Sequence, residues 1–150
     1  MRESGASVVR EIPEGRPTAA PSLARVSELL DEVRAAGLPV ELQVHGEPRD
    51  LPQALDVSAY RVLQEGLSNV LRHAGRVPTA VSLRHDPAAL VVAVEDDGPD
   101  PSHQPTGGPG GHGLLGIRER VALFGGAVEA GPRPEGGFRL SARFPLQDAR

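Results

Sequence analysis

The sequence predicts an α/β fold of the α+β type: a two-layer sandwich in which helices cover one face of a mixed, mostly antiparallel sheet. Three observations support this prediction. The chain has 150 residues, 39% of them hydrophobic, which is enough for one buried core. Segments with helical and with alternating apolar spacing follow in the order helix, strand, helix, two strands, helix, two strands. Asp86 and Pro87 join the second and third strands, which is typical of a hairpin.

The first third of the chain contains a lead-in segment, a helix and a strand. Residues 1–21 are interrupted by proline and glycine and have no clear periodicity, so we expect a flexible lead-in. Ser22 is placed to cap a helix that Gly37 and Pro39 end. Residues 40–44 alternate between apolar and polar side chains and predict a strand. The apolar positions of this helix have helical spacing: Leu23, Val26, Leu29, Leu30 and Val33.

The middle of the chain predicts a long helix followed by two strands. Residues 56–74 have the clearest helical pattern in the sequence, and Gly75 is placed to end this helix. Residues 79–85 and 90–95 predict strands, and the second is nearly all apolar, so it should lie in the centre of the sheet. The apolar stripe of the long helix consists of Tyr60, Leu63, Leu67, Val70, Leu71 and Ala74.

An irregular segment and three further elements complete the chain. Residues 96–113 have no periodicity and are rich in Gly, Pro and Asp. A loop of this length inside a compact domain is usually functional. Residues 114–124 predict a helix that a pair of glycines ends, and residues 127–131 predict a short strand. Residues 138–144 alternate strictly and predict a half-buried final strand.

The composition excludes several classes of function. All 16 basic residues are arginine, which excludes a P-loop and Schiff-base chemistry, since both need a lysine. There is no cysteine, so disulfides and thiolate sites are excluded as well. The net charge of -4 and the 3% of aromatic residues argue against a nucleic-acid partner. No apolar run approaches the ~18 to 20 residues of a membrane span, so we expect no direct membrane contact.

Four polar residues lie on one ridge of the long helix. Arg61, Glu65, Asn69 and Arg72 are spaced by four, four and three residues, which places them beside the apolar stripe. One interpretation is a solvated helix face with ion pairs. The side-chain amide of Asn69 favours a second interpretation, a binding site, because asparagine is a mediocre helix former and adds nothing to an ion pair. Its side-chain oxygen is, however, a suitable ligand for Mg²⁺.

Two glycine-bearing segments downstream are suited to a nucleotide. Asp96, Asp97 and Gly98 follow an apolar strand, where a carboxylate can accept a hydrogen bond from an exocyclic amine and a glycine lets the backbone approach a planar ligand. Asp-Asp-Gly is also a common turn signal. Residues 110–117 run from glycines into a helix, whose free N–H groups suit phosphates. A flexible linker before a helix is the alternative interpretation.

In this order and at this spacing, the three segments resemble the GHKL ATPase superfamily. The pattern QExxxNxxRHA, which begins at Gln64, resembles the N-box of sensor histidine kinases of the nitrate-sensor-like subfamily. Two glycine boxes and the final hairpin of that subfamily are similar to residues 94–98, 111–121, 136–138 and 144–146. The resemblance covers roughly residues 22–146.

The resemblance implies a Bergerat-type sandwich with an ATP lid at residues 99–110. The catalytic domain would span residues 22–148, with residues 1–21 as a flexible lead-in or the end of a dimerisation region. ATP and Mg²⁺ would be the ligands. Asn69 would hold Mg²⁺ and Asp96 the adenine amine. The other ATP-binding positions that the resemblance implies are Arg72, His73, Gly98, Gly111, His112, Gly113 and Leu114.

The role of Glu65 is less defined than that of its neighbours. It occupies the position at which hydrolytic members of the superfamily keep a general base. In the kinases this role is open, because the acceptor is a histidine on another domain. Catalysis would depend mostly on positioning and charge neutralisation, through Glu65, Asn69 and Arg72.

The implied function is the ATP-binding catalytic domain of a sensor histidine kinase. It would pass the γ-phosphoryl group of Mg·ATP to a histidine on a separate dimerisation domain, for signalling to a response regulator. We expect it in the cytoplasm, either free or as the cytoplasmic part of a membrane-anchored kinase. The phosphoacceptor motif is missing, because the histidines of this chain have the wrong surroundings.

One departure from the family pattern keeps alternatives open. The first glycine box usually continues Gly-x-Gly, but this chain has Gly98, Pro99 and Asp100. Asp100 puts the lid geometry and the nucleotide affinity in question. Asp100 keeps open a nucleotide-binding regulatory module without transfer activity. A free-standing serine kinase of the anti-sigma type is the other alternative, because its N-box is similar.

Overall fold

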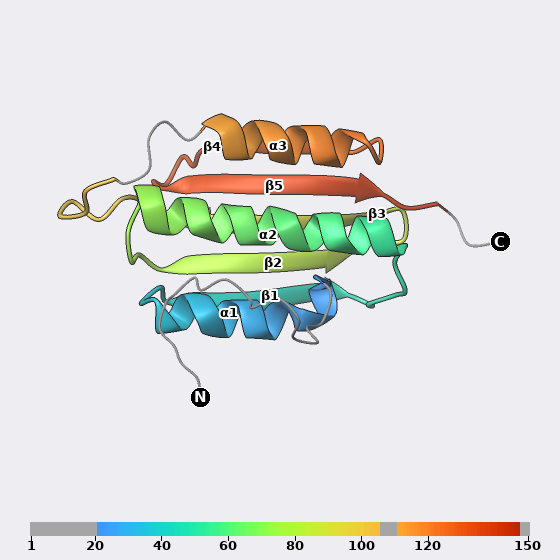
Figure 1. Ribbon diagram of the computed structural model, residues 1–150, viewed down its shortest axis with the longest axis horizontal. Coiled ribbons are helices and arrows are strands. Elements are labelled where there is room, and N and C mark those ends of the chain that lie inside the picture. Colours follow the sequence, from blue (N-terminus) through green and yellow to red (C-terminus); the bar gives the residue numbers. More distant parts are fainter. Residues whose placement is uncertain (1–20, 106–110, 148–150) are drawn as a thin grey trace, which may run out of the picture.

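The computed structural model describes residues 21–105 and 111–147. Within these residues, five strands form one sheet in the order β1-β2-β3-β5-β4. β1 is parallel to β2, and the other neighbouring strands pair antiparallel. This confirms the mixed, mostly antiparallel sheet and the central place of β3 (Figure 1). The strands are β1 (Val40–Gly46), β2 (Thr79–His85), β3 (Ala89–Asp96), β4 (Ala127–Pro132) and β5 (Phe138–Pro145).

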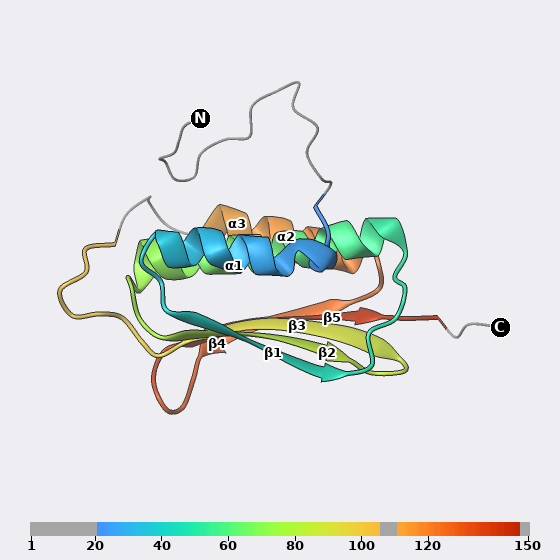
Figure 2. The same cartoon turned by 90° about the horizontal axis from the view of Figure 1, so that it is seen from below.

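The helices all lie on one face of this sheet, as the sequence predicts (Figure 2). A short 3-10 helix, η1 (Leu23–Arg25), leads into α1 (Val26–Ala35), which covers the β1 side. α2 (Gln53–His73) crosses the middle of the sheet, and α3 (Gly111–Ala122) lies over the β4 and β5 side. The result is the predicted two-layer sandwich, with a hydrophobic core between the helices and the sheet.

Two helices begin earlier than the sequence predicts. α2 starts at Gln53, directly after Pro52, instead of at residue 56, so Asp56 lies in its first turn. α3 starts at Gly111 instead of residue 114 and ends at Ala122 instead of residue 124. Its first turn contains two glycines, which have low helix propensity and no side chain to continue an apolar pattern. The apolar spacing therefore could not reveal that turn.

α2 supplies the centre of the core and approaches the sheet closely at one glycine. A Cβ added at Gly66 would lie 2.9 Å from Cγ2 of Val94 and 3.1 Å from Cδ2 of Leu140. The glycine therefore lets the helix backbone settle against β3 and β5. Neighbouring side chains of α2 that are fully buried include Val62, Leu63 and Leu67. This packing fixes the distance of α2 from the sheet and its rotation about its own axis, and therefore the position of Asn69.

The first helical segment is tied to α2 by a carboxylate. Ser22 caps η1, as predicted, through a hydrogen bond from the backbone N–H of Ala24 to its Oγ. The Ser22 hydroxyl itself donates to Oδ2 of Asp56 at 2.7 Å, and the Leu23 N–H donates to Oδ1 of Asp56 at 2.9 Å. Asp56 therefore connects the beginning of the described chain to the helix that carries the candidate site. Neither α2 nor any other helix in residues 21–105 and 111–147 has the length and apolar character needed to cross a membrane.

Candidate functional site

A cavity of about 390 Å³ lies between the C-terminal half of α2 and the sheet. This volume is within the range of ligand-binding pockets, which are mostly apolar with a few placed polar groups. Four of the residues predicted for the site line it together: Asn69, His73, Asp96 and Leu114. The other lining residues are Gly66, Val70, Ala74, Val94, Pro99, Gly137, Phe138 and Leu140.

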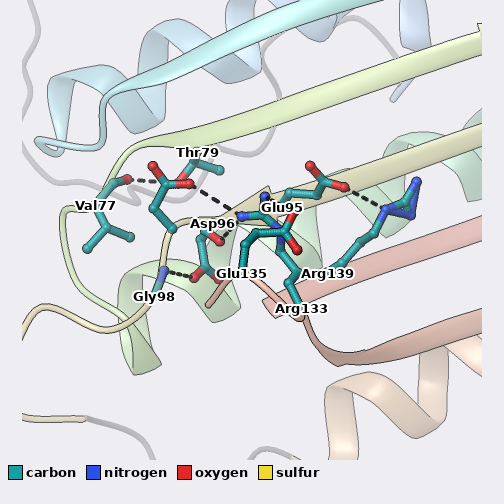
Figure 3. Close-up of polar contacts among 9 residues, drawn as sticks. Val77, Thr79, Glu95, Asp96, Gly98, Arg133, Glu135 and Arg139 are labelled. Atoms are coloured by element: carbon teal, nitrogen blue, oxygen red, sulfur yellow. Dashed lines mark hydrogen bonds and ion pairs between the residues drawn. The ribbon is translucent and has the colours of Figure 1, made fainter. Parts of the chain in front are cut away.

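Asp96 lies at the end of β3 and is 4% exposed. Its Oδ1 accepts a hydrogen bond of 2.8 Å from the backbone N–H of Gly98, which holds the carboxylate in one orientation (Figure 3). Within the described part of the chain, no hydrogen bond reaches its other oxygen. Gly98 has a φ of 107°, a conformation that glycine adopts without strain. The Asp-Asp-Gly sequence is therefore a turn, as one interpretation held, and the turn fixes a buried carboxylate beside the cavity.

The ridge of α2 brings Glu65, Asn69 and Arg72 together. Nη2 of Arg72 donates to Oδ1 of Asn69 and lies 3.5 Å from Oε2 of Glu65. Arg61 does not join this cluster, since its Nη1 donates to Gln64. Arg72 and Glu65 have side chains that are about one-third exposed, at 35% and 32%, so both are accessible to solvent. The asparagine oxygen thus faces a site where an arginine partly offsets the charge of a carboxylate.

The beginning of α3 lies against the same cluster. A Cβ added at Gly113 would overlap Oε2 of Glu65, so only glycine fits here without displacing the carboxylate. Glu65 therefore lies beside Gly113 in the first turn of α3, and the free N–H groups of a first helical turn favour anions. Gly111 and His112 are in this turn. The predicted contact of the His112 side chain with a phosphate lies outside the described residues.

His73 provides the site with a polar atom that lacks a partner. Its Nε2 is buried and makes no hydrogen bond to the residues described by the structure, although His73 lines the cavity. A buried polar atom without a hydrogen bond costs free energy, so a ligand that supplies one would bind favourably there. This observation supports the predicted place of His73 in a binding site.

The segment after Gly98 closes the C-terminal end of α2. The Asp100 N–H donates to the Ala74 carbonyl at 2.8 Å, and Nε2 of His103 lies 2.8 Å from the Arg72 carbonyl. Both carbonyls belong to the last turn of the helix, where backbone acceptors have no helical partner. Gly75 has a φ of 93°, and a Cβ added there would lie 2.9 Å from Cγ of the His103 ring. The first part of the predicted lid is thus anchored on the helix that carries Asn69, Arg72 and His73.

Asp100 stands where the family pattern has glycine, and its backbone does not need one. No residue other than glycine in the described ranges has a positive φ. Oδ1 of Asp100 accepts hydrogen bonds from the Ser102 N–H at 3.0 Å and the Ser102 hydroxyl at 2.9 Å. The backbone hydrogen bond, followed by that of the hydroxyl, lowers the pKa of Asp100 below its usual value of 3.8. Asp100 therefore stabilises a turn at the base of the lid.

Sequence reasoning missed the contribution of the hairpin between β4 and β5. Gly137 and Phe138 line the cavity, and Arg133 from the same turn donates to the Asp96 carbonyl at 2.7 Å. The pair Gly136-Gly137 indicated a turn, but nothing local in the sequence places this turn beside Asp96. Val94 and Leu140 are further lining residues, which the sequence predicts only as apolar positions of the central and the final strand.

The comparisons with known proteins show the family and the fold of the chain. Residues 55–148 match the family described as histidine kinase-, DNA gyrase B-, and HSP90-like ATPase. The sensor histidine kinase LnrJ of Bacillus subtilis is 29% identical over 140 residues, 91% of this chain and 33% of that protein. The sensor histidine kinase YxjM of the same organism is 32% identical over 143 residues, 93% of this chain and 34% of that protein. The chain therefore spans about a third of the length of these curated relatives.

A solved structure shows the same arrangement of elements. The blue-light activated histidine kinase of Erythrobacter litoralis superposes with a TM-score of 0.60 at 25% sequence identity, over 84% of this chain and 42% of that chain. The assignment to the nitrate-sensor-like subfamily stays a prediction. Because the family match covers more than half of its residues, the chain belongs to the histidine kinase-, DNA gyrase B-, and HSP90-like ATPase family, whose domain binds ATP.

Proposed function

We propose that this chain is the ATP-binding catalytic domain of a sensor histidine kinase, spanning residues 22–148 with residues 1–21 as a lead-in. It transfers the γ-phosphoryl group of ATP to a histidine on a separate dimerisation domain of the same kinase, which then signals to a response regulator. Since the reaction needs ATP, we place it in the cytoplasm. The observation that carries the proposal is the cavity in which Asn69, His73 and Asp96 meet. The names of the relatives, which are sensor histidine kinases, support the reaction class.

In this proposal the base lies between the sheet and α2. The free oxygen of Asp96 accepts a hydrogen bond from the adenine amine, while the turn at Gly98 holds the carboxylate in place. Apolar side chains on both sides of the cavity, Val94 and Leu140 among them, exclude water from the ring faces. Exclusion of water strengthens the hydrogen bond to Asp96, because the local dielectric constant falls.

The phosphates extend from the base toward α2 and the first turn of α3. The amides of Gly111, Gly113 and Leu114 donate to phosphate oxygens, with His112 beside them, because a helix N-terminus favours anions. Arg72 leaves Asn69 to contact a phosphate oxygen, and His73 completes its hydrogen bonding there. Asn69 would hold Mg²⁺ through its side-chain oxygen, and the metal would supply charge neutralisation for the transfer. Glu65, held by Arg72, orients the incoming acceptor group.

A phosphotransfer assay in trans tests the proposal. The chain is incubated with γ-labelled ATP, Mg²⁺ and the dimerisation domain of its own full-length kinase. We expect a phosphoryl group that is labile in acid and stable in base, as a phosphohistidine is, and no transfer by Asn69→Ala. An acid-stable phosphoserine on a partner protein would indicate a serine kinase. Nucleotide binding without transfer would indicate a regulatory module, and either result contradicts the proposal.

A further inference from the structure

Arg133 lies behind the turn that carries Asp96. Its Nη1 donates to the Asp96 carbonyl at 2.7 Å and lies 3.3 Å from Oδ1 of Asp97, while its Nη2 lies 3.1 Å from Oε2 of Glu135 (Figure 3). The guanidinium thus joins the hairpin between β4 and β5 to the end of β3. No part of the proposed function uses this residue.

The contact with the Asp96 carbonyl lies at the end of β3, where β2 still pairs Thr79 with Asp96 but β5 no longer pairs with the strand. The ladder between β3 and β5 ends at the pair Glu95 and Arg139, one residue before Asp96. Arg133 adds a hydrogen bond to the backbone of this next residue, while the Gly98 N–H holds its carboxylate. The two contacts act on opposite ends of one residue. They restrict both its backbone and its side chain.

The hairpin itself is shaped to bring the guanidinium there. The Arg133 N–H donates to the Gly137 carbonyl at 2.9 Å, and the Gly136 N–H donates to the Arg133 carbonyl at 3.0 Å. Gly137 lies so close that a Cβ there would overlap the Asp96 carbonyl oxygen. The tight turn therefore places the arginine stem beside Asp96 with little freedom to move.

A second arginine on the same face provides a matched comparison. Arg139 pairs with Glu95 at 2.7 Å and makes no hydrogen bond to Asp96 among the described residues. The side chain of Arg133 is 17% exposed and that of Arg139 is 41% exposed. The two residues share charge, sheet face and neighbourhood, and they differ in the contact with Asp96.

We propose that Arg133 is a positioning residue for base recognition, which holds Asp96 so that its free oxygen meets the exocyclic amine of adenine. The inference rests on the proposed function, in which Asp96 contacts the base. A hydrogen bond weakens steeply with distance and angle, so a carboxylate held in advance binds the amine more tightly than a mobile one. Arg133 acts through Asp96 and does not touch the nucleotide.

Base selectivity measures this role directly. Dissociation constants for Mg·ATP and for the corresponding inosine nucleotide, in which a carbonyl replaces the amine, are measured by calorimetry on the whole chain. In Arg133→Met we expect the preference for ATP to fall by about fivefold, the effect of losing one well-placed hydrogen bond. Arg133→Lys, which keeps the charge but has a single donor nitrogen, should show a preference between those of wild type and Arg133→Met. Arg139→Met should leave the preference unchanged.

Two results overturn the inference. If Arg133→Met and Arg133→Lys weaken both nucleotides by the same factor, the arginine only stabilises the fold. If Arg139→Met lowers the preference for ATP as much as Arg133→Met does, the preference depends on positive charge on this face and not on the contact of Arg133 with Asp96. A double mutant with Asp96→Asn completes the test, because Arg133→Met should add no further loss of preference when the carboxylate is already gone.

The same series separates this inference from the proposed function. If Asp96→Asn leaves the preference for ATP intact, the contact between Asp96 and adenine is wrong, and the role of Arg133 is wrong with it. If Asp96→Asn abolishes the preference while Arg133→Met retains it, the adenine contact stands and only the role of Arg133 is contradicted.

Discussion

Gly137 lies against the Asp96 carbonyl at a distance that leaves no room for a side chain. It also has a φ of 89°, so any substitution there is strained. Gly136 has a φ of 105° but has nothing within 4 Å of the position of an added Cβ in the part of the chain that the structure describes. Substitution of Gly136 therefore introduces backbone strain alone, whereas substitution of Gly137 introduces both strain and a close contact.

Gly136→Ala should destabilise the protein by about 1 to 2 kcal/mol, the cost of a left-handed conformation in a residue with a side chain. Gly137→Ala should cost clearly more and should also weaken Mg·ATP binding, because Asp96 must move. Thermal unfolding and nucleotide titration of both variants check this. Equal losses in the two variants would contradict the importance of the contact with Asp96.

Asp100 gives the base of the lid a dependence on pH. Its pKa is lowered in the folded state by the hydrogen bonds from Ser102, so the turn contributes stability above pH 3.8 and loses it as the pH falls through the lowered value. The Ser102 amide chemical shift should therefore titrate with a midpoint below 3.8. Asp100→Asn, which keeps an acceptor oxygen but no titrating proton, should abolish this titration. A midpoint at or above the usual value would contradict the turn.

α2 illustrates how a single element can carry both the core and the site. Gly66 lets it approach β3 and β5, and Asn69, three residues further along, lines the same cavity as Gly66. The Cβ of an alanine at position 66 would lie 2.9 Å from Cγ2 of Val94. α3 contains a glycine with free space beside it: a Cβ added at Gly116 would have no neighbour within 4 Å among the described residues.

Substitution of these two glycines by alanine should therefore change the stability of the protein in opposite directions. Gly116→Ala should stabilise the protein by about 0.5 to 1 kcal/mol, because alanine has the higher helix propensity. Gly66→Ala gains the same propensity but must displace packed side chains, at a cost of roughly 1 to 3 kcal/mol, so we expect a net loss. Chemical denaturation measures both values. Stabilisation by Gly66→Ala would show that α2 can shift without cost.

The joint between η1 and α2 depends on Asp56. Removal of its carboxylate leaves the Leu23 N–H and the Ser22 hydroxyl without their partner. Asp56→Ala should therefore destabilise the protein by about 1 to 2 kcal/mol, comparable to the loss of a helix cap. Asp31→Ala removes an exposed ion pair with Arg34 and should change stability by less than about 0.5 kcal/mol. Similar effects of the two variants in urea unfolding would contradict this joint.

The fold of the whole molecule can be predicted from patterns that are local in the sequence. The site depends in addition on contacts between segments that lie far apart in the chain. Periodicity predicted the order of elements, the central strand and the single helical layer, because each element must bury one apolar face. Asn69 and Asp96 could be placed in the site because their motifs are short and contiguous. Arg133 could not, since its contact with Asp96 spans 37 residues and depends on how a hairpin folds back. The first turn of α3 escaped prediction for a different reason: Gly113 packs against Glu65, and glycine has a low helix propensity.

Thermal unfolding with and without Mg·ATP tests most directly the claim that the cavity between α2 and the sheet binds the nucleotide. At 100 times its dissociation constant, Mg·ATP should stabilise the chain by roughly 2.7 kcal/mol. For a protein of this size that free energy raises the melting temperature by about 5 to 10 °C. Asp96→Ala should lose most of this shift, while Gln43→Ala on β1 should retain it. A melting temperature that does not change at millimolar Mg·ATP, or that rises equally in Asp96→Ala, would contradict the account.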